Sequence, residues 1–160
     1  MRTIAIALSL TLFAAAAVAQ QAPAPKLFTS ASDVQGMIAK AKAERKDQPT
    51  IAQNLIKSAP YNVNLEYRAS VGPAAVHEKE VEMFYVVDGS GTLVTGGKLK
   101  DEKRNNADNL GGTGIDGGNS REIAKGDFFF VPANTPHWFS KINGTLVLMS
   151  LHGPSSTMTR

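Results

Sequence analysis

The sequence predicts an all-β domain, a sandwich or barrel of short strands, with one short helix before it. Residues 63–71 alternate between apolar and polar side chains, which is the period of a strand with one buried face. Further runs rich in β-branched and aromatic residues follow at 83–87, 92–95, 127–131 and 145–151. Turn sequences at 88–91 and 143–144 separate these runs. Many short strands joined by turns are typical of a sandwich or barrel.

The composition narrows the classes of function. The chain has 160 residues, 42% hydrophobic and 19% charged, which suits one compact domain. Because there is no cysteine, thiolate metal sites, cysteine nucleophiles and disulfides are excluded, and a metal would need histidine or carboxylate ligands. The formal net charge of +3 is a small excess without a basic stripe, which argues against a nucleic-acid partner.

The first residues have the pattern of a secretory signal peptide at 1–19. A short positive start precedes an apolar run from Ile4 to Val18, which ends in small residues. A retained anchor would need about 20 apolar residues with charged flanks, whereas here a polar, proline-bearing linker follows at 20–30. We therefore expect a periplasmic or secreted protein that keeps no stable membrane anchor after cleavage.

A helix is predicted over about 31–46, at the start of a segment that also holds a connecting strand and extends to residue 58. Ser30 and Asp33 have the spacing of a capping pair. One helical face carries the apolar residues Val34, Met37, Ile38 and Ala41. The barrel itself is predicted over 59–154.

A polar, glycine-rich stretch at 97–120 is longer than a hairpin turn requires. We expect an insertion into the barrel, mobile or acting as a lid, that can be removed without unfolding the domain. Its G-x-G-x-x-G sequence at 112–117 leads into no helix, so it does not predict a dinucleotide site.

Two segments, 72–89 and 126–139, carry the residues suited to chemistry. The first contains His77, Glu82 and Gly89, and the second contains Pro132 and His137. Together they resemble the two motifs of the cupin superfamily, G-x5-H-x-H-x3-4-E-x6-G and G-x5-P-x-G-x2-H-x3-N, over about residues 60–152. This resemblance implies a double-sheet β-barrel of the jelly-roll type.

The first motif departs from the family pattern at one metal ligand. Counting back from Glu82 places His77 at the family's second histidine, and Ala75 then stands where the first should be. A different register makes His77 the first histidine and Lys79 the second, but it leaves only two residues before Glu82. We prefer the register that aligns Ala75 with the first histidine.

The second motif departs at residues that are not metal ligands. Gly126 and Pro132 are spaced as in the family, and His137 stands at the ligand position. Asn134 replaces the family's glycine, and asparagine adopts positive φ more readily than other non-glycine residues. Lys141 replaces the final asparagine.

The resemblance implies a divalent transition metal held by His77, Glu82 and His137. Strands bring alternate residues to one face, so these three side chains can meet inside a barrel. Such ligands suit Fe, Zn or Mn, and also Ni or Cu. The alternative is that the three are unrelated surface, turn and salt-bridge residues. His152, the one other histidine, replaces the missing ligand only if it points inward.

Further site residues are predicted around this centre. Glu80 or Tyr67 is expected to move a proton during isomerase, lyase or dioxygenase chemistry on a small organic molecule. The aromatic residues expected to contact that ligand are Phe84, Tyr85, Trp138 and Phe139. The alternative function is a sensor or carrier module with a degenerate metal site. The family resemblance also implies a homodimer.

Overall fold

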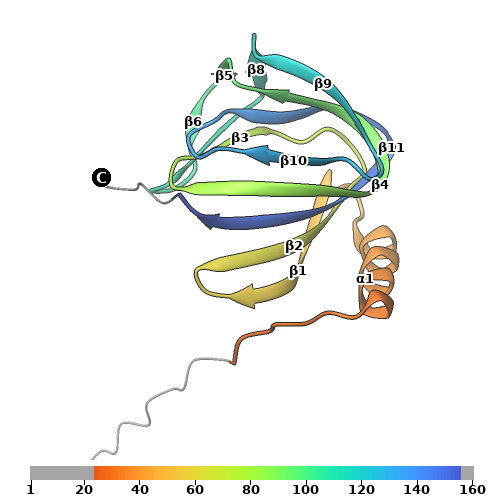
Figure 1. Ribbon diagram of the computed structural model, residues 1–160. Coiled ribbons are helices and arrows are strands. Elements are labelled where there is room, and N and C mark those ends of the chain that lie inside the picture. Colours follow the sequence, from red (N-terminus) through yellow and green to blue (C-terminus); the bar gives the residue numbers. More distant parts are fainter. Residues whose placement is uncertain (1–23, 156–160) are drawn as a thin grey trace, which may run out of the picture.

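Two long strands, β4 (Glu80–Thr95) and β11 (His137–Pro154), organise the fold and pair antiparallel along most of their length. The computed structural model describes residues 24–155 (Figure 1). Both strands bend at matching points, where the register shifts between Ile142 and Leu146 opposite Gly89. A Cβ at Gly89 would lie 1.9 Å from the carbonyl oxygen of Thr145, so the close contact at this corner requires glycine.

Two turn predictions are wrong, because the residues concerned form the bend inside β4 and β11. The sequences at 88–91 and 143–144 were expected to end strands, but each lies inside one long strand. The physical reason is that β4 and β11 stay paired through the corner, so their glycines serve a bend instead of a hairpin turn.

The bend divides the strands between two facing sheets. The first sheet has the order β1-β2-β11-β4-β10, and its other members are β1 (Thr50–Ser58), β2 (Tyr61–Arg68) and β10 (Phe128–Val131). The second has the order β6-β7-β3-β11-β4-β9, and its other members are β3 (Ala74–His77), β6 (Lys103–Arg104), β7 (Asn109–Gly112) and β9 (Asn119–Ala124). The predicted all-β double-sheet class is therefore confirmed.

An apolar core lies between the two sheets. Its buried members are Phe84, Val86, Leu93, Ile123, Val131, Phe139, Leu146 and Leu148. They come from β4, β9, β10 and β11, so both halves of each long strand contribute. This core supports the half of the barrel beside the polar side chains described below.

Helix α1 (Ala31–Glu44) covers the outer face of the first sheet (Figure 1). Ser30 and Asp33 form the predicted capping box, in which each side chain accepts a hydrogen bond from the other residue's backbone N–H at 3.1 Å. The helix packs onto the sheet through an outer cluster of buried residues: Val34, Ala41, Leu55, Leu65, Tyr67 and Val147.

Strand β2 turns its apolar face outward, toward α1, and its polar face into the barrel. Tyr67 is 5% exposed and lies in the outer cluster, whereas Glu66 is buried on the opposite side beside Ser150. The prediction that Tyr67 reaches the site is therefore wrong. The alternation of side chains correctly identified the two faces, but the helix buries the apolar face and leaves the polar one for the interior.

Residues 97–120 are not the expected polar loop. They contain β5 (Lys98–Lys100), β6, β7 and β8 (Gly114–Asp116) and the start of β9. Strands β5 and β8 form a small sheet that covers the second sheet, where Ile115 and Leu99 pack with Ala74, Val94 and Trp138. Since β7 also pairs with β3, the segment is an integral part of the fold.

The predicted signal peptide at 1–19 and the first residues of the linker lie outside the described residues. Among those described, no helix is long and apolar enough to cross a membrane.

We predict that replacing Leu65 with alanine lowers the free energy of unfolding by about 2–5 kcal/mol, because a fully buried leucine leaves a cavity beneath α1. Urea denaturation measures this change. The same substitution at Leu27, which is 67% exposed, is the control and should change stability by less than about 0.5 kcal/mol. Equal effects at the two positions would contradict the packing of α1 on β2.

Candidate metal centre

Four side chains from three strands converge on one point inside the barrel. The carboxylate of Glu82 lies at the centre, with its Oε2 atom 2.9 Å from His137 Nε2 and 3.5 Å from His77 Nε2. Its other oxygen, Oε1, lies 3.1 Å from His152 Nε2. The rings of His137 and His152 have centroids 5.4 and 5.5 Å from that of His77.

Strand pairing produces this convergence. His152 lies directly opposite Glu82 in the β11–β4 ladder, and His137 lies opposite Ala75 in the β11–β3 ladder. Residues directly opposite in an antiparallel pair share a face of the sheet. His77 is the last residue of β3, two positions beyond Ala75, and so shares that inner face as well.

The predicted convergence of His77, Glu82 and His137 is confirmed as geometry, and His152 joins them. The ligand atoms of His77, Glu82 and His152 all lie within 4.8 Å of one another, a group that could hold a metal ion. His137 falls outside that group although it makes the shortest contact with Glu82. His137 is included among the candidate ligands because its Nε2 atom approaches the carboxylate more closely than either of the other imidazoles does.

Each imidazole turns its Nε2 atom to the centre and has an oxygen beside its Nδ1 atom. His137 Nδ1 lies 3.1 Å from the carbonyl oxygen of Thr135, which can only accept, so Nδ1 carries the hydrogen. His152 Nδ1 lies 3.5 Å from Glu80 Oε2. In a neutral ring with hydrogen on Nδ1, the Nε2 lone pair is free for a cation.

The orientation of His77 follows from a hydrogen-bond chain in the 97–120 segment. Asn106 Oδ1 accepts from the backbone N–H of Asp108 at 3.0 Å and from Asn109 Nδ2 at 2.9 Å. This contact fixes the orientation of the Asn109 side-chain amide, and the amide oxygen lies 2.5 Å from His77 Nδ1. His77 therefore donates from Nδ1 and turns a bare Nε2 to Glu82. The sequence indicated no role for Asn109, because β7 was not predicted.

Glu82 is a buried carboxylate with an oxygen that lacks a hydrogen bond. The residue is 3% exposed, and Oε2 has no hydrogen-bond partner among the described residues even though His137 Nε2 lies within reach. Burial raises the pKa of Glu82, and the hydrogen bond and charge of a protonated His137, then the charges of protonated His77 and His152, lower it by more. The net pKa lies below the ordinary value, so the carboxylate is ionised near neutral pH.

The donor set fits a divalent transition metal. With Nδ1 of His137 already carrying hydrogen, the 2.9 Å contact between Nε2 and the ionised Glu82 Oε2 requires either a second proton on the ring or a metal ion between the two atoms. Three imidazole nitrogens and one carboxylate suit Fe, Mn, Zn, Ni or Cu better than Ca or Mg, which prefer oxygen. A metal ion held by these four ligands would keep coordination positions for a substrate or water.

The remaining predicted residues differ in which face of their strand they occupy, the inner face or the outer one. Phe84 and Phe139 are buried in the interior, with the Phe84 ring centroid 6.5 Å from that of His137. Tyr85 and Trp138 are one position out of phase and face away from the site. Tyr85 is 44% exposed, and Trp138 packs beneath the β5–β8 sheet with its Nε1 donating to the carbonyl oxygen of Gly72. The ligand contacts predicted for Tyr85 and Trp138 are therefore wrong.

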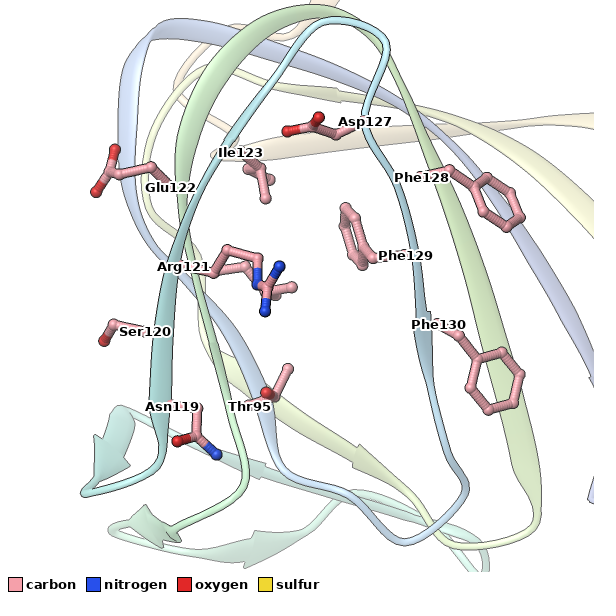
Figure 2. A pocket seen from close by; sticks show the side chains of 11 residues that line it. Thr95, Asn119, Ser120, Arg121, Glu122, Ile123, Asp127, Phe128, Phe129 and Phe130 are labelled. Carbon is pink, nitrogen blue, oxygen red and sulfur yellow. The ribbon is translucent and has the colours of Figure 1, made fainter.

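Phe128 and Phe130 are the first and third residues of β10. They are 66% and 52% exposed and point away from the interior, whereas Phe129 between them points inward (Figure 2). Glu80 is placed near the site, but its observed contact is with the outer nitrogen of His152.

A buried polar network beyond the metal centre was missed. Glu66 Oε2 accepts from Arg68 at 2.6 and 2.9 Å, and its Oε1 accepts from Ser150 Oγ at 2.6 Å. The Arg68 guanidinium also lies 4.3 Å from the centre of the Phe139 ring, a cation–π contact. The polar half of the alternation at 63–71 was the available signal, since it marks the face that enters the barrel.

Comparison with known proteins supports the fold. No protein-family model matches the sequence, and no curated protein matches it. Among solved structures, the chain is similar to the cupin domain of Schizosaccharomyces pombe Cnp3, with a TM-score of 0.50 and 13% identity over 68% of this chain and 66% of that one. It is also similar to the DMSP lyase DddQ from Ruegeria pomeroyi DSS-3, with a TM-score of 0.52 and 14% identity over 86% and 70%. The chain has the cupin fold.

We predict that replacing Arg68 with methionine lowers the free energy of unfolding by about 3 kcal/mol, because it leaves the Glu66 carboxylate buried without its cation. Urea denaturation of the single variants and of the Glu66→Gln/Arg68→Met double variant forms a double-mutant cycle. The double variant should be more stable than the sum of the two losses implies. Strict additivity would show that the pair is not coupled.

Proposed function

We propose that the protein is a metal-dependent enzyme acting on a small organic molecule, with Fe, Mn or Zn held by His77, Glu82, His137 and His152. The observation that carries this proposal is the convergence of three imidazole Nε2 atoms on the buried Glu82 carboxylate, at 2.9, 3.1 and 3.5 Å from its oxygens. One metal ion can bind all four groups at once, whereas a single proton bridges only one nitrogen and one oxygen.

His152 takes the place of the histidine that the cupin pattern has at position 75. Ala75 lies beside His137 on the inner face, where its methyl group offers no donor atom. His152 reaches the same centre from the other sheet, beside Glu82. The site thus keeps three imidazoles and one carboxylate, with one imidazole supplied by the last strand.

Glu80 is proposed to orient His152 and to carry protons at the mouth of the barrel. Its carboxylate is half-exposed and lies 3.5 Å from His152 Nδ1. It also lines a cavity of about 280 Å³ together with Asn109, the partner of His77. A carboxylate that contacts both solvent and a ligand's outer nitrogen is placed to pass protons between them.

A bound metal would supply positive charge and open coordination positions for a substrate oxygen. The chain's own residues hold the substrate beside it, since Phe84 and Phe139 form an apolar wall and exclude water. Lyase, isomerase or dioxygenase chemistry fits this arrangement, and the lyase DddQ has the same fold. The alternative of a degenerate, non-catalytic module depended on the missing ligand at Ala75, and His152 supplies a fourth donor.

We also propose secretion after cleavage of residues 1–19.

We predict that the purified protein takes up about one transition-metal ion per chain. The His152→Ala variant should bind it more than about 100-fold more weakly, a larger loss than removal of a ligand's hydrogen-bond partner causes. Metal analysis after dialysis against Fe²⁺, Mn²⁺ or Zn²⁺ measures this, with His137→Ala as a second ligand variant.

The matched control restores the imidazole at the family position. An Ala75→His/His152→Ala double variant should regain much of the metal, because position 75 faces the same centre. Circular dichroism verifies that each variant is folded. A folded wild-type protein without metal, or a His152→Ala variant that binds it as tightly as wild type, would contradict the proposal.

A further inference from the structure

A cavity of about 730 Å³ opens between β9 and β10, the edge strands of the two facing sheets. Figure 2 shows it from close by. Phe129 and Ile123 line its inner part and belong to the barrel core. The cavity therefore leads from solvent into the space between the sheets.

Arg121 places a positive charge in this cavity. It lies opposite Leu93 in the β9–β4 ladder, and Leu93 is buried in the core, so both residues face inward. Figure 2 shows the guanidinium extending from β9 toward Phe129. Among residues 24–155, the exposed side chain of Arg121 makes no hydrogen bond and no ion pair.

The acidic residues of the lining do not neutralise Arg121. The Glu122 carboxylate accepts from Thr92 Oγ1 at 2.6 Å and points away from the cavity (Figure 2). Asp127 accepts from the backbone N–H of Ala124 at 2.8 Å, within its own turn. By contrast, Lys79 pairs with Asp108 at 2.5 Å, and Arg104 pairs with Glu78 at 2.7 Å. The guanidinium of Arg121 has no such carboxylate partner among the described residues.

The same cavity reaches the neighbourhood of the metal centre. Thr95 lines it and lies directly opposite His137 in the β4–β11 ladder. Phe129 stacks on Phe84 at 5.0 Å between ring centroids, and Phe84 approaches the His137 ring. Phe129 and the buried Phe84 thus form a row of aromatic contacts between the cavity lining and the His137 ring.

Strand geometry sets the scale of a ligand that could span this path. Asn119, Thr95 and His137 lie in one row across β9, β4 and β11. Arg121 lies on β9 two residues beyond Asn119, so it is two strands and two residues away from His137. Two strand spacings and a two-residue offset place the two Cα atoms roughly 12 Å apart. Because both side chains project from the same face of the sheet, a similar distance separates the guanidinium from the imidazole, which leaves room for an acid of a few carbons.

We infer that this cavity binds a small organic acid, whose carboxylate pairs with Arg121 and whose carbon chain lies over Phe129 toward the metal centre. A guanidinium matches a carboxylate with two parallel hydrogen bonds, and Asn119 and Thr95 add polar groups beside it. The apolar lining residues Leu93, Ile123 and Phe129 suit a carbon chain better than a phosphate dianion. The inference rests on the proposed function only for the end of the ligand that faces the metal.

Binding of butanoate and of the uncharged butanamide, measured by ligand-observed NMR, tests the carboxylate site. Wild-type protein should bind butanoate at least tenfold more tightly than butanamide, and Arg121→Gln should abolish this preference. Lys125→Gln is the matched control, because it removes an exposed charge outside the cavity lining. An unchanged preference in Arg121→Gln, or tighter Arg121-dependent binding of inorganic phosphate than of butanoate, would overturn the inference.

Mn²⁺-loaded protein tests the direction of the ligand. Paramagnetic relaxation should be stronger at the terminal methyl protons of butanoate than at the C2 protons beside the carboxylate. Stronger relaxation at C2 would mean that the carboxylate binds the metal, and it would overturn the inference.

The Glu82→Gln variant separates this inference from the proposed function. Arg121-dependent binding of butanoate should persist in that variant even if it binds no metal. If wild-type protein also binds no metal, that persistence supports the acid site while the proposed function fails. Loss of the preference for butanoate in folded Glu82→Gln protein would instead overturn an acid site that is independent of the metal.

Discussion

The buried carboxylate of Glu82 is the constraint on which the site depends. An ionised group that is 3% exposed must be compensated, and three imidazoles from β3 and from both ends of β11 surround it. Their outer nitrogens face oxygens of Asn109, Thr135 and Glu80, so their inner lone pairs are directed to the same point. The three imidazoles and the carboxylate form a set of four ligands, and a cation bound between them would stabilise the close contact between His137 and Glu82.

The two long bent strands make this convergence possible. Because β4 and β11 pass from one sheet into the other while paired, β11 carries His137 in the second sheet and His152 in the first. Residues fifteen positions apart on one strand thereby face each other across the barrel interior. The same bend leaves β9 and β10 on different sheets with an opening between them, which exposes Arg121 to the interior.

The sequence predicted the all-β class, the helix, its capping box and the convergence of His77, Glu82 and His137. These depend on local periodicity and on motif spacing, which a single sequence contains. It predicted Tyr67, Tyr85 and Trp138 wrongly because strand alternation defines two faces without saying which one enters the barrel. For β2 that choice depends on α1, which buries Tyr67 from outside. Asn109 and the inward direction of His152 depend on long-range pairing with β3 and β4, which no local pattern specifies.

X-ray absorption spectroscopy of the metal-loaded protein would count the imidazoles around the ion. We expect three imidazole nitrogens and a carboxylate oxygen as ligands, at the distances of about 2.0–2.2 Å typical of such groups. A coordination sphere with no more than one imidazole, completed by water oxygens, would contradict this expectation.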